Sequence, residues 1–99
     1  MLKDILIIDG YNVIFAWPEL KKLSRESLEH ARLTLRDQLM NFCKYKEYEG
    51  ILVFDGKYTA TPASVEELAK GFFEVYTDDG DTADSYIERE VFLRKGKYT

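Results

Sequence analysis

The stretch that decides the fold is Asp4-Ile-Leu-Ile-Ile-Asp-Gly-Tyr-Asn12. Its apolar run, Ile5 to Ile8, has the length of a strand. The lack of alternation is typical of a strand covered on both faces in a parallel α/β sheet. The run ends in Asp9-Gly10, a turn signal. Ligands of open α/β sheets bind just beyond the carboxyl ends of the strands. Asp9 therefore stands where a functional carboxylate would be placed, although it could also serve only as a cap for the turn.

The composition sets the class of protein. The chain has 99 residues, 45% of them hydrophobic, and a net charge of −4. This predicts one domain, residues 1–99, with enough apolar side chains for a core. The acidic balance argues against a simple basic clamp for nucleic acid. It does not argue against a nuclease, because clustered metal-binding acids lower the net charge themselves.

The same composition bears on location. No apolar run approaches the length of a membrane span, and the opening lacks the pattern of a signal peptide. The single Cys43 lies in a helical pattern and is expected to be a buried thiol, which suits a reducing compartment. We therefore expect a cytoplasmic protein with no membrane partner.

A second apolar run repeats the opening pattern. Ile51–Phe54 ends in Asp55-Gly56. The intervening segment predicts an amphipathic helix from Ser24 or Ser27 to about Glu47, with Gly50 as its terminator. Its expected core face consists of Leu28, Ala31, Leu35, Leu39 and Phe42. Strand, helix and strand form a right-handed crossover with parallel strands, so Asp9 and Asp55 are expected at the same sheet edge.

The remaining elements follow from local signals. Residues 13–18 read as a loop that packs inward, with a short turn over residues 18–23. Ser64 and Glu67 match a capping box, which predicts a short helix to about Lys70. Phe72–Tyr76 reads as a third strand, and Glu74 indicates an edge position for it. A last helix is expected from Asp81 or Thr82 to about Phe92.

Further acids gather before and within this last helix. The stretch from Asp78 to Asp84 holds four acids, and the helix dipole explains part of that clustering. Asp84 falls in the first helical turn, near the expected edge of Asp9 and Asp55. Glu88 lies one turn later, and Asp81 is a further candidate.

Converging carboxylates either have raised pKa values or hold a cation. Oxygen ligands select Mg²⁺ or Mn²⁺. The lone His30 disfavours zinc and triad chemistry, and no glycine-rich phosphate loop is present. These observations favour a metal-dependent phosphodiesterase.

The residues also resemble a known family. Ile7 to Ile14, followed by Ala16-Trp17-Pro18, is similar to the opening of the YacP-like NYN proteins, which belong to the PIN-like ribonuclease superfamily. The similarity continues with Ala31-Arg32, with Val53-Phe54-Asp55, and with Thr82-Ala83-Asp84 before Ile87-Glu88. Order and spacing agree over nearly the whole chain.

This resemblance implies an α/β fold, the PIN-like three-layer α/β/α arrangement with a parallel sheet. This chain would carry the first three strands, in the order 3-2-1, and their flanking helices. The resemblance further implies an endoribonuclease that depends on Mg²⁺ or Mn²⁺ and acts on single-stranded RNA, with mRNA as one candidate. Asp9 and Asp84 would bind metal, Asn12 would orient the site, and Asp55 would add an acid at the rim. Glu88 and Asp81 would be further candidates.

Three residues outside the acid cluster are candidates for RNA contact. They are Trp17, Arg94 and Lys95. Each also has a structural interpretation, since Trp17 could anchor its loop and the two basic residues suit a helix end.

The family continues into a fourth strand that carries another site acid, whereas this sequence ends at Thr99. We therefore expect a truncated domain whose first strand is an exposed edge. Exposed apolar edges pair with other chains, which predicts a homo-oligomer through Ile5 to Ile8. The missing fourth strand and the acidic net charge leave open a non-catalytic RNA- or protein-binding module. The acids that are present also leave open a phosphohydrolase for small molecules.

Overall fold

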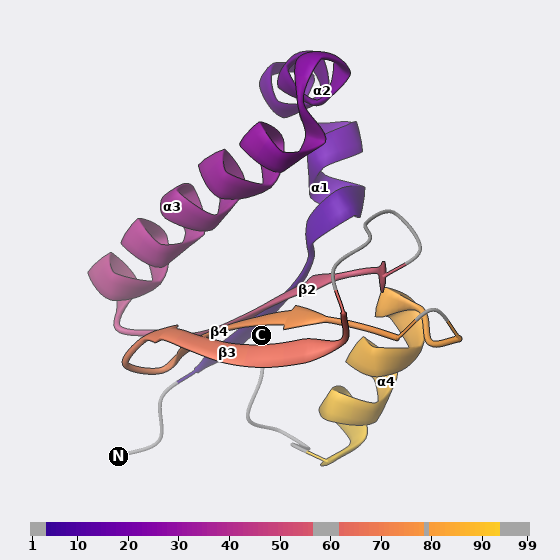
Figure 1. The fold of residues 1–99 in the computed structure, drawn as a ribbon. Helices are drawn as coiled ribbons and strands as arrows, with labels where there is room; N and C mark the ends of the chain where they lie inside the picture. Colours follow the sequence, from indigo (N-terminus) through magenta and orange to yellow (C-terminus); the bar gives the residue numbers. More distant parts are fainter. Residues whose placement is uncertain (1–3, 57–61, 79, 94–99) are drawn as a thin grey trace.

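A sheet with helices on both faces makes up the chain (Figure 1). The computed structural model describes residues 4–56, 62–78 and 80–93. Its elements, in chain order, are β1 Ile5–Asp9, α1 Gly10–Ala16, α2 Pro18–Glu26, α3 Leu28–Lys46, β2 Glu49–Phe54, β3 Ser64–Ala69, β4 Phe72–Tyr76 and α4 Ala83–Leu93. The strand order is β1-β2-β4-β3.

The first three strands predicted from sequence form the parallel part of the sheet. β1 pairs with β2, placing Asp9 beside Val53, and β2 pairs with β4, placing Phe54 beside Tyr76. The predicted crossover is thus confirmed. Because the strands are parallel, Asp9 and the residue after Phe54 reach the same edge of the sheet, which is what the site requires.

The segment expected to be a short helix is instead strand β3. Ser64–Ala69 pairs antiparallel with β4, with Val65 opposite Val75. Gly71 adopts a positive φ of 79° in the tight turn between the two strands. The sheet therefore has four strands rather than three. Pairing with β4 satisfies the backbone hydrogen bonds of this segment, and this tertiary contact prevails over the local capping-box signal for a helix.

The extra strand also corrects the expected position of β4. Glu74 is only 5% exposed, and β4 lies between β2 and β3 rather than at an edge. The Arg36 side chain on α3 compensates the buried carboxylate, with Nε 3.3 Å from Oε2. A buried carboxylate needs such a partner, and this one is 38 residues away in sequence.

The expected loop after β1 is helical. Asp9 caps α1, and its carboxylate accepts the backbone N–H of Asn12. Trp17 interrupts the helix in an extended conformation, and Pro18 begins α2 at the first helical position, where proline is well tolerated. The loop prediction was wrong because Asp9-Gly10 starts a helix directly and does not form an isolated turn.

The long amphipathic helix is confirmed as α3. The Ser27 hydroxyl caps it by accepting the backbone N–H of His30. It ends at Lys46 with Glu47 as its C-cap, whose φ of 59° is left-handed, and Gly50 lies within β2, so the expected terminator was wrong. On the buried face, Cys43 takes the place expected for Phe42, which is 42% exposed.

Two apolar clusters lie on opposite faces of the sheet. One joins the sheet to α1, α2 and α3 and includes Ile14, Leu35 and Phe54, which are fully buried. The other joins the sheet to α4 through Val53, Val75 and Ala83. Figure 1 shows α1 to α3 on one side and α4 on the other, as the predicted three-layer arrangement requires.

Strand β1 has a neighbour on one side only within the described part of the chain. This agrees with the expected edge position, whereas pairing between copies stays a prediction. In the same residues, no helix is both long and apolar enough to cross a bilayer.

Candidate active site

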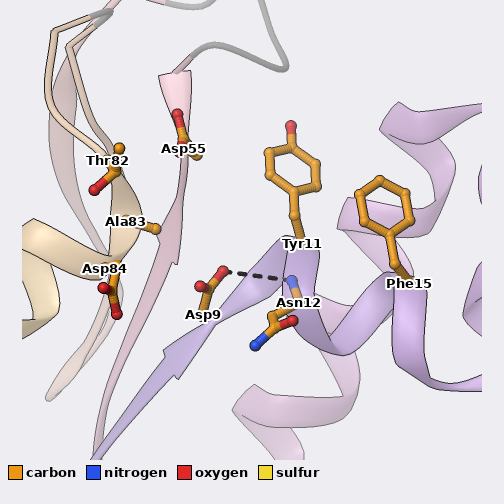
Figure 2. A pocket seen from close by; sticks show the side chains of 8 residues that line it. All are labelled: Asp9, Tyr11, Asn12, Phe15, Asp55, Thr82, Ala83 and Asp84. Carbon is orange, nitrogen blue, oxygen red and sulfur yellow. Dashed lines mark hydrogen bonds between the residues drawn. The ribbon is translucent and has the colours of Figure 1, made fainter.

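A cavity of about 500 Å³ opens at the carboxyl ends of β1 and β2. Figure 2 shows acids and a helix start on one side of it and two aromatic rings on the other. Its lining residues are Asp9, Tyr11, Asn12, Phe15, Asp55, Thr82, Ala83 and Asp84. The fold therefore brings together three chain segments that are far apart in sequence.

Asp9 lies at the centre of the cavity wall because it ends β1 and caps α1. The backbone N–H of Asn12 donates to Asp9 Oδ1 over 3.4 Å, and the Asn12 side chain also faces the cavity (Figure 2). Burial raises the pKa of the Asp9 carboxyl, and the Asn12 N–H opposes this. The nearby carboxylates of Asp55 and Asp84 raise the pKa further. The three acids thus interact electrostatically.

The buried Thr77 links the two chain segments that carry Asp55 and Asp84. Thr77, which follows β4, accepts the backbone N–H of Gly56 at its hydroxyl over 3.0 Å. The same hydroxyl donates to the Asp81 carbonyl over 2.7 Å. One side chain thereby links the turn after Asp55 to the segment that leads into α4.

The start of α4 places Asp84. The Thr82 hydroxyl accepts the backbone N–H of Ser85 over 3.1 Å, which is an N-cap interaction. Asp84 follows in the first turn and is exposed, whereas Asp55 is 7% exposed. The predicted cap and the predicted position of Asp84 are both confirmed.

Aromatic side chains make the opposite wall. Tyr11 is 2% exposed, and Phe15, one helical turn later on α1, is 42% exposed. Their rings are nearly parallel, at 16°, with centroids 6.0 Å apart. Arg32 Nη1 donates to the Tyr11 hydroxyl over 3.1 Å. Sequence reasoning missed both residues, since the spacing of four becomes informative only once α1 is known to be a helix.

The structure separates the predicted site residues into two groups. Asp9, Asn12, Asp55 and Asp84 line the same cavity, as predicted. Asp81 does not line it. Its carboxylate pairs with Arg89, and hydrogen bonding from that guanidinium lowers the pKa of Asp81.

The other candidates lie elsewhere. Glu88 lines a separate hollow with Arg89 and Phe92. Trp17 is 48% exposed and lines a neighbouring hollow of about 370 Å³ that shares Asp9 and Asn12 with the cavity. Arg94 and Lys95 lie outside the described residues.

The donor set suits a hard cation. Among the described residues, no three His, Cys, Asp or Glu side chains are close enough to hold a metal ion by themselves. Mg²⁺ is usually held by one or two carboxylates together with water and substrate phosphate. Asp9 and Asp84, with Asp55 and Asn12 lining the same cavity, fit that pattern and offer no ligands that favour zinc.

Comparison with known proteins confirms the resemblance. YacP of Bacillus subtilis is 35% identical over 86 residues, which cover 87% of this chain and 50% of that protein. The crystal structure of Rae1 (YacP) from the same organism superposes with a TM-score of 0.76 at 33% identity, over 91% of this chain and 51% of that one. A Rae1 mutant gives a TM-score of 0.68 at 38% identity, over 89% of this chain and 49% of that one.

The chain thus spans about half the length of the relatives that it matches. The sequence profile of the YacP-like NYN domain matches residues 6–97. With the fold and nearly the whole described sequence in agreement, the chain belongs to the YacP-like NYN domain family.

Proposed function

We propose that this chain carries the acidic centre of an endoribonuclease that depends on Mg²⁺ or Mn²⁺ and cleaves single-stranded RNA. The observation that carries the proposal is the meeting of Asp9, Asp55 and Asp84 in one cavity at the carboxyl edge of a parallel sheet. Membership of the NYN family, whose fold is nuclease-like, supports it.

The electrostatics of the cavity explain why a cation is part of the proposal. Uncompensated carboxylates at Asp9, Asp55 and Asp84 repel each other and would also repel an RNA phosphate. The chain as a whole carries a net charge of −4, so it offers RNA no general attraction. A divalent cation removes both conflicts and, when bound, supplies Lewis acidity to the phosphate and to an attacking water.

The residues of the chain have distinct roles in this proposal. Asp9 and Asp84 hold the cation from the end of β1 and the first turn of α4. Asp55 adds negative charge at the rim. Asn12 orients the site, because its backbone N–H holds the Asp9 carboxylate and its side chain faces the same cavity. Because a bound cation would contact the RNA phosphate, no glycine-rich phosphate-binding loop is required.

The proposed setting follows from the same features. The substrate is RNA, with mRNA as one candidate. The thiol of Cys43 is free and buried, and burial raises its pKa. An inert thiol suits a reducing compartment, so we place the activity in the cytoplasm.

Cleavage of a labelled single-stranded RNA in Mn²⁺ tests the proposal. We expect cleavage that EDTA abolishes and that Asp84→Asn reduces by about 100-fold or more, because a group that positions charge at the reacting phosphate is lost. Asp37→Asn is the matched control: Asp37 is exposed on α3 and does not line the cavity, so this variant should cleave like wild type.

RNA binding without cleavage in any metal would support the alternative function, a non-catalytic RNA-binding module. Cleavage that persists in EDTA, or that Asp84→Asn and Asp37→Asn lower equally, would contradict the proposal.

A further inference from the structure

Four aromatic rings run from the cavity wall into the core of the protein. Phe15 lies nearly parallel to Tyr11. Tyr11 packs against Phe54 with centroids 5.1 Å apart, and Phe54 stacks on Tyr76 with centroids 5.5 Å apart. Phe54 is fully buried, so the core fixes the ring against which Tyr11 packs.

Arg32 holds the middle of the row in place. Its guanidinium donates to the Tyr11 hydroxyl and also interacts with the Tyr76 hydroxyl. Tyr11 therefore has little freedom to move, and Phe15 has a rigid ring behind it. Phe15 is the most exposed of these four rings, at 42%, and shares the cavity with Asp9, Asp55 and Asp84.

With a divalent cation held by the three carboxylates, the cavity would offer a positive charge beside a large apolar ring, which suits a ligand that is part anionic and part flat. A nucleotide has that character, since its phosphate carries charge and its base has an apolar face. A cavity of about 500 Å³ is within the size range of small-ligand sites and can hold one nucleotide. Bases of single strands stack on aromatic side chains in this way.

We propose that Phe15 is the stacking surface for the nucleobase next to the phosphate that the acids hold. This inference rests on the proposed function. Phenylalanine has no hydrogen-bonding group, so stacking on Phe15 would accept all four bases. A base can reach this ring only when it is not paired within a duplex, so Phe15 would favour single strands over duplexes.

The chain supplies a close control for this residue. Phe42 is also 42% exposed, but it lies on α3 and packs edge-on against Tyr48 with centroids 6.0 Å apart. It does not line the cavity with the acids. Substitution of Phe42 therefore removes an equally exposed ring without touching the proposed site.

The test measures the affinity of a labelled single-stranded RNA for wild type and each variant by fluorescence anisotropy. Ca²⁺ replaces Mg²⁺ in every arm, so that the acids still hold a hard divalent cation, and electrophoresis after each titration confirms that the RNA is intact. We expect Phe15→Ala to weaken binding by roughly 5- to 150-fold, the effect of losing one base–aromatic stack. Phe15→Leu should weaken it as well, Phe15→Trp should preserve it, and Phe42→Ala should leave it unchanged. Circular dichroism confirms that each variant is folded.

A set of RNAs with one abasic nucleotide each identifies the stacked base. At one position, removal of the base should weaken binding to wild type but cause no further loss in Phe15→Ala. Equal affinity of Phe15→Ala and wild type, or loss in Phe15→Ala that is the same at every abasic position, would overturn the inference while leaving the proposed function standing. Absence of RNA binding by wild type would overturn the proposed function and this inference together.

Discussion

Substitution of Gly10 by alanine should damage both the stability of the fold and the site. Gly10 lies between Asp9 and Tyr11 at the first position of α1, against the ring of Phe54. A Cβ at this position would be 2.3 Å from Phe54 Cε1 and 2.7 Å from Cδ1. Ordinary contact begins near 3.4 Å, so one of the two groups has to move by about 1 Å, a displacement that a close-packed interior resists.

Neither group has room for this movement. Phe54 is fully buried between the rings of Tyr11 and Tyr76. Overpacking of this kind costs roughly 1–3 kcal/mol. For a domain of this size, each kcal/mol lowers Tm by about 4–8 °C. Any gain in helix propensity from alanine is smaller than this cost, at most about 1 kcal/mol.

Thermal unfolding followed by circular dichroism measures the effect, with Gly80→Ala as the matched control. A Cβ at Gly80 meets nothing within 4 Å. That variant should therefore be neutral or slightly stabilised, by up to about 1 kcal/mol, since alanine reduces the entropy of the unfolded chain. A Gly10→Ala protein that is as stable as wild type would refute the packing of α1 against Phe54 described above.

Three further predictions concern charge and the exposed edge. In EDTA, burial and the carboxylates of Asp55 and Asp84 hold the pKa of Asp9 in the folded protein above its usual 3.8. The protonated carboxyl therefore stabilises the fold fully below the unfolded pKa, and this contribution is lost as pH rises through the folded pKa. Asp9→Asn, which keeps an N-cap, should therefore raise Tm at neutral pH, and the difference should narrow below pH 3.8; an equal shift at all pH values would contradict this. Arg36→Met leaves the buried Glu74 unpaired and should cost about 1–3 kcal/mol in urea unfolding, and an unchanged midpoint would argue against the ion pair. We also propose that a second copy of this chain pairs through β1, since the edge adjoins a hollow lined by apolar side chains, including Ile7. Ile7→Lys should convert the dimer to a monomer in sedimentation velocity, and a wild-type monomer at high micromolar concentration would refute the pairing.

The parallel strands and their acids could be predicted because each signal was local and repeated. Two apolar runs that end in Asp-Gly, separated by one long amphipathic helix, leave little choice but a crossover with Asp9 and Asp55 at one edge. Asp84 could be placed because Thr82 marks the start of a helix. These inferences did not depend on contacts between distant side chains.

The errors arose where tertiary contacts decide the local structure. Ser64–Ala69 carries a helix-start signal, but pairing with β4 prevails. Glu74 looked like an edge residue because its partner Arg36 belongs to another element. Phe15 went unnoticed because the segment after Asp9 was read as a loop, in which a spacing of four residues has no meaning.

Binding of Mn²⁺ by the chain tests most directly whether the converging acids form a metal site. Free Mn²⁺ can be followed by its electron paramagnetic resonance signal as protein is added. We predict that wild type and Asp37→Asn reduce the free signal equally, whereas Asp84→Asn reduces it much less. Equal binding by all three proteins, or no binding by wild type, would contradict the assignment of Asp9 and Asp84 as metal ligands.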